Sequence, residues 1–279
     1  MRALERFPAT ILILVAIVSV QAGAALAKSL FSQFGAIGTV YLRVLFAAII
    51  LWLLVRPGLN LWRQGRWKII VVFGAVLVGM NSFYYLALER LPLGLTVTIE
   101  FFGPLGVALW QSRRPLDLLW VALAAGGIVL LNPLSGALDS VGLIFAVIAG
   151  ACWAAYILLG QRIGGALPGA QGLTLSMIVG ALLMTPLSTV PVLENVEYGF
   201  GILFAIGVAF LSSVVPYTLE IEALRRMPTR QFGILMSLEP AVASVIGWLM
   251  LSEQLTLTQW AAVFLVMSAS YGVVRFGKT

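Results

Sequence analysis

The sequence predicts an all-α integral membrane protein, with ten transmembrane helices in two inverted five-helix repeats and both termini in the cytoplasm. The first observation is composition: 61% of the 279 residues are hydrophobic, 10% are charged, and the mean hydropathy is +1.04. Such a chain cannot cover a water-facing surface with polar side chains, which excludes a soluble domain. The other observations are the spacing of the apolar segments and the distribution of basic residues among the loops.

Ten apolar segments are long enough to cross a bilayer. A helix rises 1.5 Å per residue, so about 20 residues span roughly 30 Å of hydrocarbon. The segments are 9–27, 36–55, 67–88, 93–110, 116–132, 140–160, 170–190, 199–219, 230–251 and 257–274. They lack the period-two alternation of a membrane β-barrel, so helices are the predicted structure.

The first segment has some features of a cleaved signal peptide. Arg2 and Arg6 precede the apolar run, and Ala22-Gly23-Ala24 resembles a cleavage site. The run is nevertheless long enough to span, and its removal would leave nine spans with an inverted charge pattern. We therefore predict that it is the first transmembrane helix.

Basic residues are concentrated in every second loop. Of the 17 Lys and Arg residues, all but Lys28, Arg90 and Arg43 lie at the termini or in the second, fourth, sixth and eighth loops. Because positive residues favour the cytoplasmic side, both termini are predicted to lie in the cytoplasm. This bias and anionic lipid headgroups account for the net charge of +6, so no nucleic-acid partner is predicted.

An internal repeat is visible in the positions of proline. Leu91-Pro92 is followed 12 residues later by Pro104, and Met227-Pro228 is followed 12 residues later by Pro240. Five spans per half is an odd number, so the second half must enter the membrane from the opposite side. We predict repeats at residues 1–133 and 134–279.

Pro104 and Pro240 each free one backbone carbonyl inside a span, because proline lacks an N–H group. The freed carbonyls belong to Glu100 and Met236. Two interpretations are open: a kink that serves helix packing, or a helix break that lines a cavity.

Three ionisable residues on three spans are predicted to lie at a similar depth. Arg43, Glu100 and Glu239 each stand seven to eleven residues inside their segments, about 10–16 Å from the membrane surface. A charge at this depth is costly unless it is paired or wetted. Arg43 and Glu100 could form a structural ion pair, or the acids could face a polar cavity and bind an ammonium group or a proton.

Several uncharged residues could complete such a cavity, although each is individually more typical of packing or of the membrane interface. Gln21, Asn81 and Thr96 offer hydrogen bonds, and the candidate aromatic walls are Tyr84, Tyr85, Trp153, Tyr156 and Tyr217. The fifth and tenth segments carry small residues and no internal charge. They are predicted to pack at the periphery or against a second copy in a homodimer.

The chain contains no His and a single Cys, Cys152. An internal disulfide is therefore impossible, and no metal, cofactor or enzymatic active site is predicted. Without histidine, an internal proton carrier would have to be a carboxylic acid.

Four blocks of sequence resemble the EamA-type branch of the bacterial drug/metabolite transporter superfamily. They are GMNSFYYLALERLPLGLTVTIEFFGPLGVALWQSRRPLD from Gly79, GAALAKSLF from Gly23, GACWAAYILLGQR from Gly150 and MPTRQFGILMSLEPA from Met227. The resemblance implies ten helices in two inverted repeats and proton-driven export of small neutral amino acids such as threonine and homoserine. It also implies that Glu100 and Glu239 belong to motifs in which an acid precedes a proline.

The functional hypothesis is therefore an amino-acid exporter of the bacterial inner membrane that works by alternating access, with protons and membrane lipid as its other partners. One alternative is broad efflux of lipophilic or cationic compounds, which the aromatic residues favour and Arg43 opposes. A membrane-embedded enzyme is disfavoured, because the sequence lacks metal-ligand clusters and large polar loops.

Overall fold

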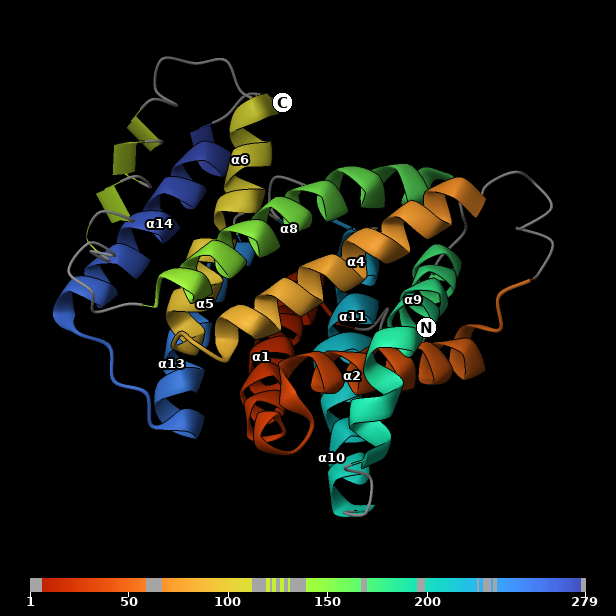
Figure 1. The fold of residues 1–279 in the computed structure, drawn as a ribbon. Helices are drawn as coiled ribbons and strands as arrows, with labels where there is room; N and C mark the ends of the chain where they lie inside the picture. Colours follow the sequence, from red (N-terminus) through yellow and green to blue (C-terminus); the bar gives the residue numbers. More distant parts are fainter. Residues whose placement is uncertain are drawn as a thin grey trace.

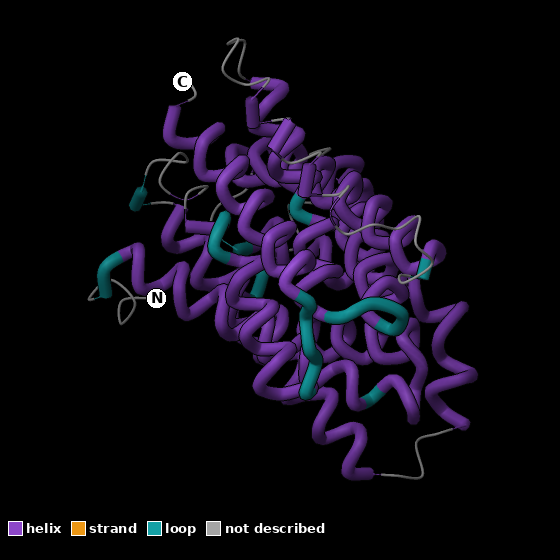
Figure 2. The backbone as a smooth tube through the Cα atoms, turned by 90° about the vertical axis from the view of Figure 1, so that its left-hand side faces the viewer, coloured by secondary structure: helices purple, strands orange, loops and turns teal. Residues whose placement is uncertain are grey.

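The computed structural model describes residues 7–58, 67–111, 119–120, 122–123, 126–127, 130, 139–166, 170–194, 199–224, 226–227, 232 and 235–276. Within these residues every regular element is a helix (Figure 2). They are α1 (Ala9–Ser29), α2 (Phe31–Val55), α4 (Trp67–Leu88), α5 (Leu93–Glu100), α6 (Phe102–Gln111), α8 (Ser140–Ala166), α9 (Gln171–Glu194), α10 (Gly199–Ala209), the π-helix η3 (Phe210–Val214), α11 (Val215–Leu224), α13 (Glu239–Leu251) and α14 (Leu257–Phe276). The prediction of an all-helical chain is confirmed.

Among the described residues, five helices are long and apolar enough to cross a membrane. They cover Ala9–Ser29, Phe31–Val55, Trp67–Leu88, Ser140–Gly160 and Phe200–Glu220. Four shorter apolar helices cover Leu93–Val107, Gln171–Pro186, Glu239–Leu251 and Leu257–Ala269. These helices coincide with predicted segments, whereas most of the predicted segment 116–132 lies outside the described residues.

A glycine interrupts α2 near its start. Gly35 has φ 66° and ψ 171°, a backbone conformation that residues with a Cβ rarely adopt. Regular helix resumes at residue 36, where the sequence predicts the second span to begin. The four residues before Gly35 form a separate turn that continues directly from α1 through Leu30.

Two helices break three residues before a proline. The chain turns at Phe101 between α5 and α6, and at Ser237–Leu238 before α13. Pro104 and Pro240 follow these breaks, as expected for residues that cannot donate to the carbonyl four positions earlier. The carbonyl of Glu100 faces α8, since a Cβ added at Gly150 would lie 2.7 Å from its oxygen.

Small residues allow the helices to approach closely. In Figure 1, α4 and α8 run side by side across the molecule, and α13 lies beside α5. A Cβ at Gly103 on α6 would collide with the carbonyl oxygen of Gly150 on α8, and a Cβ at Gly94 on α5 would lie 2.7 Å from the Cα of Ser244 on α13. Such backbone contacts are typical of membrane helices, where packing rather than hydrophobicity drives association. They hold α6 against α8 and α5 against α13.

Asp139 caps the N-terminus of α8. Its Oδ1 accepts hydrogen bonds from the N–H groups of Val141 (2.8 Å) and Gly142 (2.9 Å), and its Oδ2 accepts one from Arg90 (3.0 Å). The Gly142 N–H and Arg90 hold the pKa of this carboxyl below its usual range, against a smaller opposing effect of desolvation.

We expect Asp139→Ala to lower the midpoint of thermal unfolding, because the first turn of α8 loses its cap. A depressed pKa means that the ionised cap stabilises the fold above the pKa of an unfolded aspartate. That stabilisation is lost as the pH falls through the lower folded value. Melting curves of purified parent and variant should therefore differ near neutral pH and converge in acid. Curves that differ equally at both pH values would show that the cap does not act through its charge.

Candidate functional site

Polar side chains are buried together where α1, α2, α4, α5, η3 and α13 meet. Gln21, Arg43, Asn81, Glu100 and Glu239 are each at most 7% exposed. In a chain this apolar, buried charges and amides are rare and mark candidate sites. We call these five residues, together with Ser212, Ser213 and Tyr85, the polar centre.

Gln21 on α1 and Glu239 on α13 form a hydrogen-bonded pair. The Nε2 of Gln21 donates to the Oε1 of Glu239 over 2.9 Å. Three further atoms in this region are buried without a hydrogen-bond partner among the described residues: Oε1 of Gln21, Oε2 of Glu239 and Oγ of Ser212. A buried polar atom without a partner costs about 1–3 kcal/mol, so a cluster of them marks a candidate site for a ligand, a proton or water.

Arg43 is held by three hydrogen bonds that join α2 to η3 and α4. Its Nε donates to the Oγ of Ser213 (2.9 Å), its Nη1 to the hydroxyl of Tyr85 (3.1 Å), and its Nη2 to the carbonyl of Ser212 (2.6 Å). The guanidinium also lies 5.3 Å from the centre of the Tyr85 ring. Among the described residues, Arg43 forms no ion pair with Glu100, so the interpretation of the two as a structural salt bridge is not supported.

A π-helix places the serine carbonyl that Arg43 binds. The wider turn at Phe210–Val214 breaks the regular ladder of α10 and α11, and such bulges are frequent at functional sites. Its first turn is anchored to α1, because the hydroxyl of Ser19 donates to the carbonyl of Leu211 over 2.7 Å. The sequence did not identify Ser212 and Ser213 as candidate site residues. The one feature that marks them in the sequence is a pair of adjacent hydroxyl groups in an otherwise apolar span.

Glu100 ends α5 beside the other charges. It lies within electrostatic range of Glu239 and Arg43, and Tyr84 lies within range of all three. No described Lys or Arg forms an ion pair with either acid. The three ionisable residues that the sequence places at one depth are thus brought together in space.

The other candidate residues divide into two groups. Asn81 donates to the carbonyl of Leu77 over 2.7 Å, and the Tyr217 hydroxyl lies near its side chain. Thr96 instead donates back to the carbonyl of Pro92 along its own helix.

Trp153 and Tyr156 are engaged mainly with other aromatic rings. Trp153 packs edge-on against Phe101, the residue that follows Glu100. Tyr156 stacks on Phe73, with ring centres 5.0 Å apart. Both rings therefore take part in aromatic packing between helices. Among the described residues, no group of His, Cys, Asp and Glu is placed to hold a metal ion.

The polar centre therefore brings two carboxyl groups, a guanidinium and an amide together inside a bundle of apolar helices. Buried charges and amides within helices that suit a bilayer are typical of multi-pass membrane transporters.

Comparisons with known proteins agree with this class. Residues 140–275 match the EamA-like transporter family. The chain is 42% identical to the threonine/homoserine exporter RhtA of Escherichia coli K12, over 94% of this chain and 90% of the relative, and 40% identical to RhtA of Salmonella typhimurium LT2 over the same shares. The chain therefore belongs to the EamA-like transporter family.

More distant similarities extend over most of the chain. An uncharacterized transporter of Bacillus subtilis, YwfM, is 22% identical over 74% of this chain and 72% of its own length. A solved crystal structure of another protein superposes with a TM-score of 0.63 at 18% identity, over 96% of this chain and 97% of that one. This last similarity concerns the fold alone.

Proposed function

We propose that this protein exports small neutral amino acids such as threonine and homoserine across the bacterial inner membrane, in exchange for protons. The observation that carries the proposal is the buried pair of Gln21 and Glu239, in which two oxygens have no described partner. The names of the curated relatives supply the substrate class.

The exporter would be built from ten transmembrane helices in two inverted repeats, residues 1–133 and 134–279, with both termini in the cytoplasm. Support comes from the helix breaks at Phe101 and Ser237, which are 136 residues apart and precede Pro104 and Pro240 by the same three residues. Inverted repeats place a binding site near the bilayer midplane, where the two broken helices meet.

The substrate's two charges fit opposite sides of the polar centre. A zwitterionic amino acid would place its ammonium group at the carboxyl groups of Glu239 and Glu100 and its carboxylate at Arg43. A guanidinium has five N–H donors, and three of those on Arg43 are used by Ser213, Tyr85 and Ser212. Two N–H groups therefore remain for a carboxylate.

Proton coupling would follow if Glu239 binds either a proton or the substrate's ammonium group, but not both. With no histidine in the chain, a carboxylic acid is the natural proton carrier. Arrival of a proton from the periplasm would then displace the amino acid, and arrival of the amino acid from the cytoplasm would displace the proton. This competition gives exchange without leakage of either.

Efflux of organic cations is a weaker proposal. The aromatic walls would suit a cation, but the face of Tyr85 is already covered by the guanidinium of Arg43. A fixed positive charge in the polar centre repels a substrate that carries only positive charge.

The test measures which solutes leave cells that express the protein. We expect threonine and homoserine to accumulate outside such cells, and growth to tolerate an excess of either. The matched control is Arg43→Gln, which removes the charge expected to hold the carboxylate. Resistance to dyes and other lipophilic cations without any release of amino acids would contradict the proposal.

A further inference from the structure

An ion pair joins distant parts of the chain at one end of the helix bundle. Lys28 is the penultimate residue of α1, and its Nζ donates to the Oε1 of Glu253 over 2.7 Å. Glu253 lies in the short loop between α13 and α14. The distribution of basic residues predicts that this end faces the periplasm, because Lys28 and Arg90 occupy the basic-poor loops.

The same glutamate also holds the start of α5. Its Oε2 accepts a hydrogen bond from the backbone N–H of Leu93 over 2.7 Å, and that N–H is one of the groups that a helix start leaves without an internal partner. Lys28 reaches the carbonyl of Leu91, at 3.4 Å, in the turn before α5. One ion pair therefore ties together the outer ends of α1, α5 and α13.

The backbone conformation around Glu253 fixes the position of this residue. Ser252 has a left-handed conformation with φ 54°, which turns the chain back at the end of α13. The N–H of Glu253 then donates to the carbonyl of Gly247 over 3.1 Å. A Cβ at Gly247 would lie 2.6 Å from Oε2 of Glu253, so glycine leaves the space that the carboxylate occupies.

The tied ends belong to the two helices that carry the buried acids. α5 runs from Leu93 at the ion pair to Glu100 in the polar centre, and α13 runs from Glu239 in the polar centre back toward Glu253. The two helices touch between these ends, where Gly94 lies against Ser244. Lys28 and Glu253 therefore meet at the ends of these two helices that lie away from the polar centre.

We propose that Lys28 and Glu253 form the outer gate of the transporter: an ion pair that holds the periplasmic ends of α5 and α13 together and breaks when the polar centre opens outward. This inference rests on the proposed transport function and adds to it the identity of the gate. Both side chains are partly exposed, at 27% for Lys28 and 13% for Glu253, so water can replace their mutual contact when they part.

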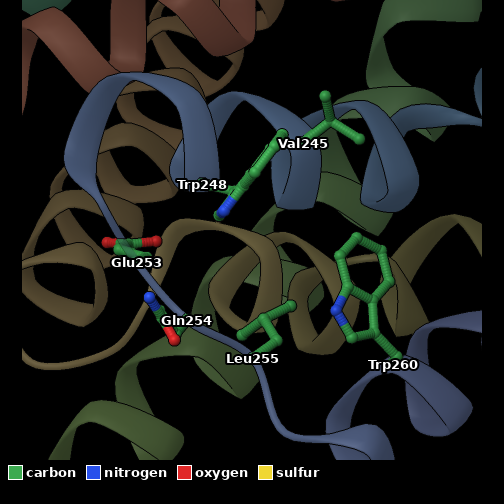
Figure 3. Close-up of a pocket in the computed structure, with 6 residues that line it drawn as sticks. All are labelled: Val245, Trp248, Glu253, Gln254, Leu255 and Trp260. Atoms are coloured by element: carbon green, nitrogen blue, oxygen red, sulfur yellow. The ribbon is translucent and has the colours of Figure 1, made fainter.

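A hollow beside the gate gives the glutamate room to move. A cavity of about 460 Å³ is lined by Val245, Trp248, Glu253, Gln254, Leu255 and Trp260. Figure 3 shows the Glu253 carboxylate at the edge of this hollow, between Trp248 and Gln254. A carboxylate that leaves Lys28 can therefore turn into open space without repacking the apolar side chains.

The test measures access from the periplasm to a cysteine beneath the gate. In a background carrying Cys152→Ser, the buried Ser244 is replaced by Cys, a change of similar size, and intact cells are treated with a membrane-impermeant thiol reagent. We expect Lys28→Met to increase the labelling rate at position 244 by about tenfold, and Glu253→Gln to act similarly. The double variant should label no faster than the better single variant, because both changes break the same contact.

Two controls separate the gate from other effects. A cysteine at the exposed Ser140, at the start of α8, should label at the same rate in every variant, which shows that expression and reagent access are unchanged. Because labelling requires no substrate, the result does not depend on whether threonine is the solute. A wild-type protein that fails to export threonine would contradict the proposed function, whereas unchanged labelling at position 244 would overturn the gate.

A second measurement tests the gate independently of labelling rates, by joining its two positions covalently and following export. Cysteines at positions 28 and 253 can be joined by a short reducible bifunctional thiol reagent in the otherwise cysteine-free chain. We expect the joined protein to lose export and to regain it on reduction. Full export by the joined protein would show that the pair is a fixed structural contact, and would overturn the proposal.

Discussion

Replacing Glu239 by glutamine is expected to abolish amino-acid export driven by a pH gradient. The amide keeps the size of the side chain and can still meet Gln21, but it carries no charge for an ammonium group and cannot take up a proton at ordinary pH. Hydrogen bonds to charged groups contribute about 1.5–3 kcal/mol, so substrate binding should weaken roughly 10- to 150-fold. The measurement is efflux of labelled threonine from vesicles that contain the purified protein.

Glu89 provides the matched control for this experiment. It lies exposed just beyond the end of α4, so Glu89→Gln removes one carboxylate of the chain without touching the polar centre. We expect that variant to export threonine at the parental rate. Parental, pH-dependent efflux by both Glu239→Gln and Glu100→Gln would remove the carboxylates from the mechanism.

Replacing Gly103 by alanine is expected to destabilise the fold strongly, although it adds only one methyl group. The new Cβ would collide with the carbonyl oxygen of Gly150, and neither backbone can yield without separating α6 from α8. Overpacking of this kind costs about 1–3 kcal/mol where side chains can adjust, and a backbone obstacle adjusts least. Thermal unfolding in detergent, followed by size-exclusion chromatography, should show a markedly lower midpoint.

The control lies on the same helix. Gly106 has nothing within 4 Å of its added Cβ, so Gly106→Ala should be neutral or stabilise the protein by about 0.5–1 kcal/mol through the better helix propensity of alanine. Equal midpoints for the two variants would show that the close approach of Gly103 to Gly150 does not hold the helices together.

Much of this architecture could be predicted from local pattern alone. The apolar segments coincide with helices because a run of about 20 hydrophobic residues has few alternatives in a bilayer. The breaks near residues 101 and 237 could be anticipated from Pro104 and Pro240, since the missing N–H acts within one turn. The part of the segment 116–132 that lies outside the described ranges remains a prediction.

The polar centre was only partly predictable, because its partners are set by tertiary contacts. Buried charge pointed to Arg43, Glu100 and Glu239, but the sequence could not show that Arg43 binds Ser213 across 170 positions instead of Glu100. The pairing of Gln21 with Glu239 spans 218 positions and follows from helix packing. Nothing in the sequence distinguishes Glu253 from other loop acids, which are ordinarily solvated.

The central claim is that a substrate and a proton compete for Glu239, and the most direct measurement is proton release when threonine binds. Purified protein in weakly buffered detergent solution is mixed with threonine while a pH-indicating dye is followed. The account predicts release of up to about one proton per bound threonine near neutral pH, and none from Glu239→Gln. Saturable binding of threonine to the parental protein without any release of protons, across the physiological pH range, would contradict it.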